Sequence, residues 1–243
     1  MAVGPGTGIG GHSTPCYNPA MQAPATDLHV ALNAHLLSGQ ASYRSAGIHQ
    51  YIHYLLRHLD AVEVPMRFTA LVGANAAPPD LGMDVLRSNR DTSSPWQRAL
   101  WEQVTLPKLA RRIKADVAHA PAFVAPLASA VPVVTTIHDL SFIRFPRLFR
   151  PANRLYIRII RRQSASQSQH LIAVSEHTAR ESGRLMGVSP DKVTVVYHGV
   201  DPRFQPLPAD QVDAFRQRRG LPERFVLFVG TLEPRKNLKR LVE

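Results

Sequence analysis

Cysteine, acidic residues and long apolar runs are all scarce in this sequence. The one cysteine, Cys16, cannot form an internal disulfide, which fits a reducing cytoplasm. No run of about 18 or more apolar residues is present, so the sequence offers no candidate membrane-spanning helix. The first 26 residues are rich in Gly, Pro, Ala and Thr and lack both the charged start and the apolar core of a signal peptide. We expect residues 1–26 to be disordered.

The shortage of acidic side chains leaves a strongly basic chain. Only 18 Asp and Glu oppose 29 Lys and Arg, a net charge of +11, and such a balance indicates a polyanionic partner. Nucleic acid is not the expected one, because the sequence has no recognisable nucleic-acid-binding module and no aromatic residues interleaved with the basic ones. Two interpretations remain for the basic segment from Arg144 to Arg162. It is a surface helix packed on a core, or a basic amphipathic helix resting on anionic lipid.

The faces of that helix can be predicted from helical periodicity. Arg158, Arg161 and Arg162 would share the basic face. The apolar side would consist of Leu155, Tyr156, Ile159 and Ile160.

Short apolar runs alternate with helical patterns from residue 27 onward. Many of the runs are rich in β-branched residues, which is typical of parallel strands buried on both faces. The predicted strands are Leu28–Asn33, Phe68–Val72, Asp84–Leu86, Asp116–His119, Val133–Ile137, His170–Val174, Val193–Tyr197 and Phe225–Val229. The predicted helices are Gly47–Leu59, Pro95–Lys114, Pro151–Ser168 and Glu176–Met186. The order predicts an α/β fold, a doubly wound Rossmann-like parallel sheet.

The texture of the chain changes after residue 200. The segment 201–210 contains three prolines, and a short polar stretch, Gln211–Arg219, is a candidate helix before Gly220 and Pro222. We therefore predict a first domain over 27–200 and an interdomain linker over 201–223. Residues 224–243 would be the first βα element of a second, truncated Rossmann-like domain, because one such element cannot bury its own faces.

Two places in the sequence combine a strand end with residues suited to ligand binding. Gly47 begins a helix after the first strand, where a small residue lets a ligand approach backbone N–H groups. His138 and Asp139 follow the buried strand Val133–Ile137, at the edge where open α/β sheets bind ligands. A histidine there could hydrogen-bond a sugar hydroxyl or a phosphate, or form a structural pair with the aspartate.

No metal site is predicted from the sequence. His49 and His53 have the i, i+4 spacing of metal ligands, but no third ligand suggests itself, and we interpret them as part of a helix face. The sequence also lacks a convincing D-x-D motif.

Four segments together resemble the family 4 retaining glycosyltransferases, which use nucleotide-sugar donors on the two-domain GT-B fold. The segments are GIHQYIHYLL, TTIHDLSFIRFP, AVSEHTARE followed by VTVVYHGVDPRF, and FVGTLEPRKNLKRLVE. The resemblance covers about residues 28 to 243, and its mannosyltransferase-like branch is the most similar. It implies that residues 27–200 form the acceptor-side domain. His198 stands where Asn is frequent in the family.

The resemblance also implies roles for single residues. Gly47 and Gly230 would let the donor diphosphate approach the backbone, and Lys236 with Arg235 would neutralise the leaving diphosphate. His138, with Asp139 beside it, would lie on the acceptor side, near the transferred sugar. No metal or other cofactor is implied, and a nucleophilic carboxylate pair of the glycosidase kind is not expected.

The function expected from this resemblance is transfer of a hexosyl unit, in the narrower form mannosyl, from a nucleotide sugar. The acceptor would be lipid-linked or a polysaccharide, and the protein would be cytoplasmic and peripheral on the inner face of the plasma membrane. The downstream donor-binding residues of the family do not follow, so we expect little activity from this chain alone. The alternative is a non-catalytic basic module that binds an anionic membrane surface or a protein partner.

Overall fold

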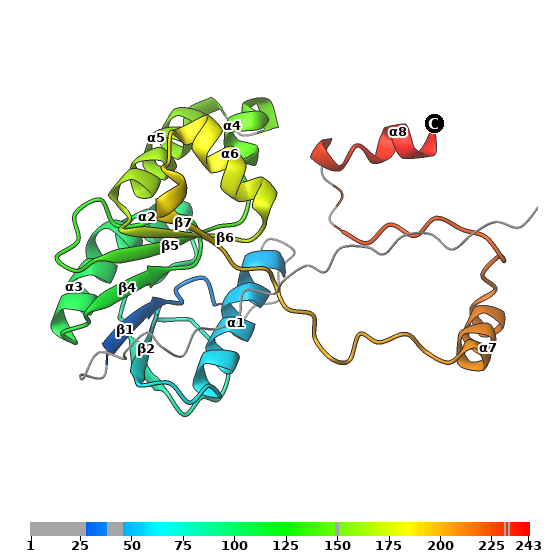
Figure 1. The fold of residues 1–243 in the computed structure, drawn as a ribbon, viewed down its shortest axis with the longest axis horizontal. Coiled ribbons are helices and arrows are strands. Elements are labelled where there is room, and N and C mark those ends of the chain that lie inside the picture. Colours follow the sequence, from blue (N-terminus) through cyan, green and yellow to red (C-terminus); the bar gives the residue numbers. More distant parts are fainter. Residues whose placement is uncertain (1–27, 38–45, 149–150, 231, 233) are drawn as a thin grey trace, which may run out of the picture.

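A seven-stranded parallel sheet forms the centre of the structure. The computed structural model describes residues 28–37, 46–148, 151–230, 232 and 234–243 (Figure 1), so the predicted disorder of residues 1–26 lies outside the described residues. The strands are β1 (Leu28–Asn33), β2 (Met66–Val72), β3 (Asp84–Arg87), β4 (Val117–Ala120), β5 (Val133–Ile137), β6 (His170–Ala173) and β7 (Val193–Val195). Their order is β3-β2-β1-β4-β5-β6-β7, and every pairing is parallel. The predicted fold class is confirmed.

Helices cover both sides of this sheet (Figure 1). They are α1 (Ala46–Asp60), α2 (Pro95–Leu100), α3 (Leu106–Arg112), α4 (Ser141–Arg144), α5 (Pro151–Gln167) and α6 (Glu176–Met186). Two further helices, α7 (Ala209–Arg219) and α8 (Leu238–Val242), lie apart from the sheet. The period of two along β1 explains the two layers. Val30 and Leu32 belong to the same buried cluster as Ile52 of α1, whereas Ala31 belongs to the cluster of Leu106 in α3.

The strand order reverses between β1 and β4. In doubly wound sheets the crevice outside the carboxyl ends of the strands at such a reversal is the usual ligand site. The loops after β1, β4 and β5 all begin there, so the topology brings residues 33–35, 119–121 and 138–139 to one edge of the sheet.

A π-helical turn interrupts the helix predicted over Pro95–Lys114. The turn η2 spans Trp101–Thr105, and the Leu106 N–H bonds to the Trp101 carbonyl, five residues earlier. Pro107 explains the interruption, because proline has no N–H to donate and its ring crowds the carbonyl four residues before it. The wider turn changes which side chains of this helix face the sheet.

The predicted basic face of α5 is not formed as expected. Arg161 turns inward and lies against the rings of Phe123 and Phe142, while Arg158 and Arg162 are exposed. Ile159, predicted on the apolar side, is 46% exposed. The rings attract the cation and hold it against the domain. An anionic membrane surface as partner therefore stays a prediction, with fewer basic side chains to support it.

The predicted strand Phe225–Val229 is wrong. These residues form no strand in the structure, and their side chains are between 37% and 83% exposed. A strand needs a neighbour for its backbone N–H and C=O groups, and the described part of the chain provides none here. The candidate helix Gln211–Arg219 is confirmed as α7, which begins two residues earlier.

No helix in the described ranges is long and apolar enough to cross a membrane.

Candidate active site

His138 leaves the carboxyl end of β5 in a defined orientation. Its Nε2 lies 2.8 Å from the carbonyl oxygen of Pro121, and because a carbonyl only accepts, Nε2 carries the proton. Burial lowers the pKa of His138 below its ordinary 6.5, and the neighbouring His198 lowers it further, against the opposing effect of the Pro121 bond. The ring is therefore neutral near pH 7, and its Nδ1 is left as a hydrogen-bond acceptor.

Two further rings pack around His138. The ring of Tyr51, in the second turn of α1, meets it edge-on at 4.7 Å between centroids. His198, in the loop after β7, stacks on it at 5.7 Å with 18° between the planes, and Tyr51 also contacts His198 at 5.2 Å. Three elements far apart in sequence thus form one cluster, which we call the His138 cluster (Tyr51, His138 and His198).

A buried hydroxyl supports this cluster from below. Thr136, on β5, lies 2.8 Å from Nε2 of His119 on β4 and 3.3 Å from the Tyr51 hydroxyl. Burial lowers the pKa of His119 to about 4 and raises the pKa of Tyr51, so both groups are neutral across the physiological range. The chain of hydroxyl and imidazole groups fixes the Tyr51 ring beside His138.

Asp139 shapes the turn that follows. Its Oδ1 accepts hydrogen bonds from the Ser141 N–H at 3.0 Å and the Ser141 hydroxyl at 2.7 Å, which starts α4. A cavity of ≈ 190 Å³ opens beside it. The lining residues are Asp139, Leu140, Ser141, Arg144, Phe145, His177, Thr178 and Glu181. Arg144 is held there by the almost fully buried carboxylate of Glu181, which accepts from its Nε at 2.7 Å.

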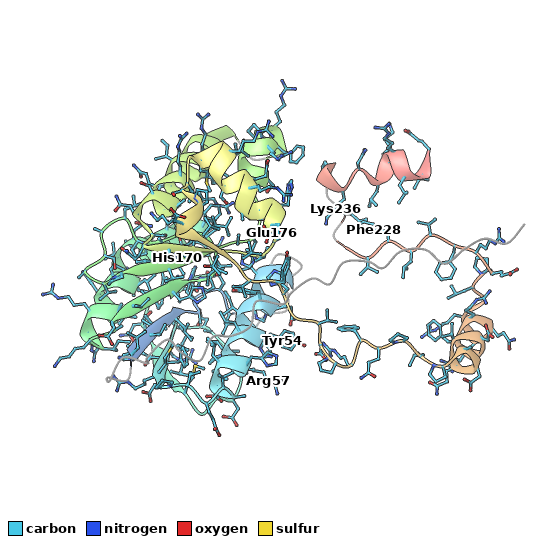
Figure 2. All side chains as sticks on the ribbon, viewed as in Figure 1. Tyr54, Arg57, His170, Glu176, Phe228 and Lys236 are labelled. Carbon is cyan, nitrogen blue, oxygen red and sulfur yellow. The ribbon has the colours of Figure 1, made fainter. Side chains whose placement is uncertain are left out.

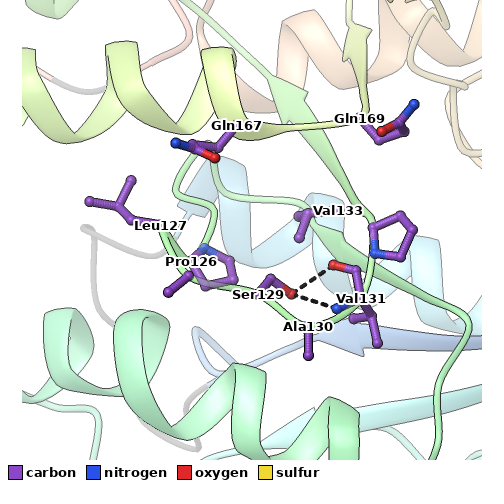
Figure 3. Close-up of a pocket in the computed structure, with 10 residues that line it drawn as sticks. Pro126, Leu127, Ser129, Ala130, Val131, Val133, Gln167 and Gln169 are labelled. Atoms are coloured by element: carbon purple, nitrogen blue, oxygen red, sulfur yellow. Dashed lines mark hydrogen bonds between the residues drawn. The ribbon is translucent and has the colours of Figure 1, made fainter.

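A second cavity lies on the side of the sheet where the strands begin. It measures ≈ 300 Å³ and is lined by residues 126–133 with Gln167 and Gln169, next to the amino ends of β5 and β6 (Figure 3). The Ser129 hydroxyl donates to the Val131 carbonyl and accepts from the Val131 N–H. This cavity is remote from the His138 cluster and has no charged side chain in its lining.

Comparison with known proteins adds the family. The profile of Glycosyltransferase Family 4 matches residues 45–204, about two thirds of the chain, and this segment contains the whole His138 cluster. The chain belongs to Glycosyltransferase Family 4.

Individual relatives are more distant. Over 112 residues the chain is 26% identical to the O-antigen chain mannosyltransferase B of Escherichia coli, which covers 45% of this chain and 29% of that protein. Among solved structures it is similar to Anabaena Alr3699/HepE in complex with UDP and glucose, with a TM-score of 0.54 and 17% identity. That likeness covers 88% of this chain and 56% of the Anabaena chain, so the present chain spans about half the length of that structure. It supports a GT-B glycosyltransferase fold.

The donor-side residues of this family 4 chain lie in two different places. Gly47 is exposed in the first turn of α1, and a Cβ there would meet no atom within 4 Å. Gly230 and the exposed Lys236 belong to a segment that lies apart from the sheet, as Figure 2 shows for Phe228 and Lys236. Among the described residues, no hydrogen bond, ion pair or ring contact joins 205–243 to 28–200. The side chain of Arg235 lies outside what the structure describes.

Three functional candidates were missed from the sequence. Tyr51 and His119 have ordinary helix and strand surroundings, and only the fold shows that they meet Thr136. His198 was considered only because Asn is frequent at its position in the family. It could have been identified from its position after a strand, since the carboxyl ends of parallel strands meet at the edge where His138 also lies.

A polar latch fixes the chain where it leaves this domain. The Tyr54 hydroxyl of α1 donates to Asp201 at 3.0 Å, and Arg203 donates to Tyr54 at 2.9 Å. Arg203 also pairs with Asp201 at 3.2 Å. The latch holds the start of the predicted linker against α1 and keeps the adjacent His198 near His138.

No group of three or more His, Cys, Asp or Glu side chains suited to a metal ion occurs within the described ranges.

The protonation of His138 can be measured directly. At pH 7, long-range ¹H–¹⁵N spectra should show a neutral ring with its proton on Nε2, because Pro121 accepts from that atom. The ring should titrate with a midpoint below 6.5, since burial opposes its charge. Comparison with His138→Gln assigns the signal. A proton on Nδ1, or a charged ring at pH 7, would contradict this geometry.

Proposed function

We propose that this chain provides the acceptor-side domain of a retaining, metal-independent glycosyltransferase. It would transfer a hexosyl unit, in the narrower form mannosyl, from a nucleotide sugar to a lipid-linked or polysaccharide acceptor. Family membership supports the reaction class. The name of the E. coli relative supports the mannosyl unit and the polysaccharide, and the Anabaena complex with UDP and glucose supports a nucleotide-sugar donor.

The observation that carries this proposal is the acceptor atom of His138. A neutral imidazole with Nδ1 available can accept a hydrogen bond from a sugar hydroxyl and orient it. The Tyr51 and His198 rings hold the imidazole in place. Proton transfer itself goes to the leaving phosphate in the proposed retaining reaction, so His138 orients the hydroxyl and does not need a high pKa.

Charge on the leaving diphosphate has to be stabilised as the glycosidic bond breaks. We assign this to Lys236 and Arg235, with Gly47 and Gly230 allowing backbone N–H groups to approach the phosphates. Fixed cations in these positions would do the work that a divalent metal does in other transferases. The exposed position of Lys236 on its own segment means that the segment must close onto the domain before transfer.

Acceptor binding and transfer are separate tests of this proposal. Saturation-transfer NMR with mannose oligosaccharides should detect binding to the 243-residue chain and its loss in His138→Ala. His170→Gln, at the amino end of β6, is the matched control and should bind as the native chain does. Binding that is indifferent to His138 would contradict the assigned role.

Transfer by the same chain should be weak. No described contact joins Lys236 to the His138 cluster, so the group that stabilises the leaving diphosphate is not in position. Sugar release from UDP- and GDP-hexoses, followed with the oligosaccharide acceptors, measures it. Robust turnover by this chain would show that the proposed division of roles is wrong.

A further inference from the structure

Arg161 is a cation that two aromatic rings hold against the domain. Its guanidinium carbon lies 4.8 Å from the ring centroid of Phe142 and 5.5 Å from that of Phe123, and both rings are almost fully buried. Protein largely encloses the guanidinium, which lowers the pKa of Arg161, yet arginine stays charged at all ordinary pH values. Enclosing a charge is unfavourable unless a partner compensates for it.

Two carboxyl groups act on this charge from a distance, but within the described ranges Arg161 makes no hydrogen bond and no ion pair within 4 Å. The two rings attract the cation through their faces, but they do not accept hydrogen bonds from the N–H groups that lie in the plane of the guanidinium. The residue as a whole is half-buried. Part of the side chain therefore reaches the surface, from a position that the two rings hold.

Two carboxyl groups act on Arg161 from a distance, those of Asp139 and Glu102. Asp139 already accepts two hydrogen bonds from Ser141 through Oδ1. Glu102, in the π-helical turn, would cancel the charge of Arg161 only if it were ionised. Its hydrogen-bonding surroundings show that it is not.

The protonation of Glu102 follows from its neighbours in three steps. Trp101 Nε1 can only donate, and it lies 3.0 Å from Asn33 Oδ1, so that atom is an acceptor. His35 Nδ1, 2.9 Å from the same oxygen, must then carry the proton. The Nε2 of His35 is left with a lone pair, enclosed and unbonded, 3.4 Å from Glu102 Oε1.

An ionised Glu102 would place its lone pairs against that of His35 in a buried place. A protonated Glu102 can instead donate toward Nε2 after a small rotation. Burial raises the pKa of Glu102 to about 8 and lowers the pKa of His35 to about 3, both in favour of the neutral pair. Arg98 and Arg161 oppose this only in part. At pH 7 the positive charge of Arg161 is therefore not cancelled by Glu102.

We propose that Arg161 is the centre of a binding site for a tetrahedral oxyanion, a phosphoryl group of the substrate, beside His138. A planar fork of N–H donors on a rigid aromatic support matches phosphoryl oxygens well. Phe123 follows β4 and Phe142 follows β5, the strand that ends before His138, and this places the site at the same edge of the sheet. That the phosphoryl belongs to an acceptor lipid or to a sugar nucleotide rests on the proposed function, whereas the anion site does not.

Sulfate is the probe for this site, because it is tetrahedral and does not titrate between pH 5 and pH 9. Thermal melts in sodium sulfate, compared with sodium chloride at equal ionic strength, should show saturable stabilisation of the native chain. Arg161→Gln should weaken sulfate binding by about tenfold or more. Arg162→Gln, an exposed neighbour with the same change of charge, should stay within about twofold of the native chain. Arg161→Lys keeps the charge without the fork and should be intermediate.

Folding of each variant is checked by its melting curve in chloride, and a misfolded Arg161→Gln is replaced by Arg161→Lys in the comparison. The proposal would be overturned if sulfate gave the native chain no saturable stabilisation. It would also be overturned if Arg161→Lys and Arg161→Gln both bound sulfate as tightly as Arg162→Gln does. Glu102→Gln is the second arm. It should leave sulfate binding at pH 7 unchanged, and a marked gain in affinity would show that an ionised Glu102 already neutralises Arg161.

The source of the phosphoryl group is tested by competition. Geranyl phosphate represents a lipid-linked acceptor and UDP represents the donor, and each is titrated against bound sulfate. Displacement by either, dependent on Arg161, supports the site and identifies its source, whereas displacement by neither overturns the assignment to substrate. These outcomes are independent of transferase activity, so failure of the site and failure of the proposed function can be told apart.

Discussion

Replacement of Trp101 by alanine should lower the free energy of unfolding by about 3–5 kcal/mol, the usual cost of deleting a large buried side chain. Trp101 is fully enclosed and belongs to the core formed by β1, β2, η2 and α3. Its ring stacks beside His35 at 6.0 Å, and its Nε1 donates to Asn33 at 3.0 Å. The variant would lose apolar burial, leave a cavity and remove one donor from a buried carbonyl.

Urea unfolding at pH 6.5 measures this loss, with Trp96→Ala as the control. Trp96 is 81% exposed on the neighbouring helix α2, so its removal should change stability by less than about 0.5 kcal/mol. Trp101→Phe keeps the ring but not the Nε1 donor, and should cost about 1–3 kcal/mol. Equal destabilisation by Trp96→Ala and Trp101→Ala would contradict the placement of Trp101 in the core.

Stability should also fall as the pH rises from about 6.5 to 8, because of Glu102. Burial raises the pKa of Glu102 from 4.5 to about 8, so the folded chain keeps a proton that the unfolded chain has already released. Each pH unit in that interval then costs about 1.4 kcal/mol, or about 2 kcal/mol in all. The Coulombic effects of Arg161 and Arg98 are already part of this balance, since both lower the pKa of Glu102.

The opposite slope is expected on the acid side. Burial lowers the pKa of His35 to about 3 and that of His119 to about 4. Below pH 6.5 the unfolded chain therefore binds protons at these two histidines, whereas the folded chain leaves them neutral. Stability should therefore rise with pH up to about 6.5, and Glu102 partly offsets this rise above pH 4.5. The maximum should lie near pH 6.5.

Glu102→Gln separates the two sides of that profile. The amide is a neutral group of the same shape as the protonated acid, so the fall between pH 6.5 and 8 should disappear while the acid side remains. Chemical unfolding at half-unit pH steps gives both slopes. A native profile that is flat or rising between pH 6.5 and 8 would show that Glu102 is ionised in the folded chain.

The part of this fold that sequence predicts best is the sheet. Strands buried on both faces are short runs of mostly apolar residues whatever the rest of the chain does, so β1, β5 and β6 could be placed within a residue or two. The ends of those strands also place ligand-binding residues at one edge, and for that reason His138 could be named beforehand. The same local reasoning failed at Phe225–Val229, where an apolar run has no neighbouring strand to pair with.

Local periodicity predicted the side chains on helices less well. Helical periodicity places Arg161 on the same face as Arg158 and Arg162, which are exposed. Arg161 turns inward only because Phe123 and Phe142, in other segments, lie beside it. Glu102 lies in a helix that Pro107 distorts into a π turn, and this decides which way its carboxyl points. Neither orientation is a property of the segment in which the residue stands.

Order along the chain and the chemistry of each strand end are therefore local properties, and the sequence determined them: a doubly wound α/β sheet with His138 at its carboxyl edge. Protonation states and charge pairing depend on distances between groups that are remote in sequence, and only the tertiary structure decided them. The proton of His138 lies on Nε2 because the Pro121 carbonyl accepts a hydrogen bond there, and the proton on Glu102 follows from the contacts among Trp101, Asn33 and His35. Burial strengthens these effects because a low-dielectric interior penalises any charge that lacks a partner.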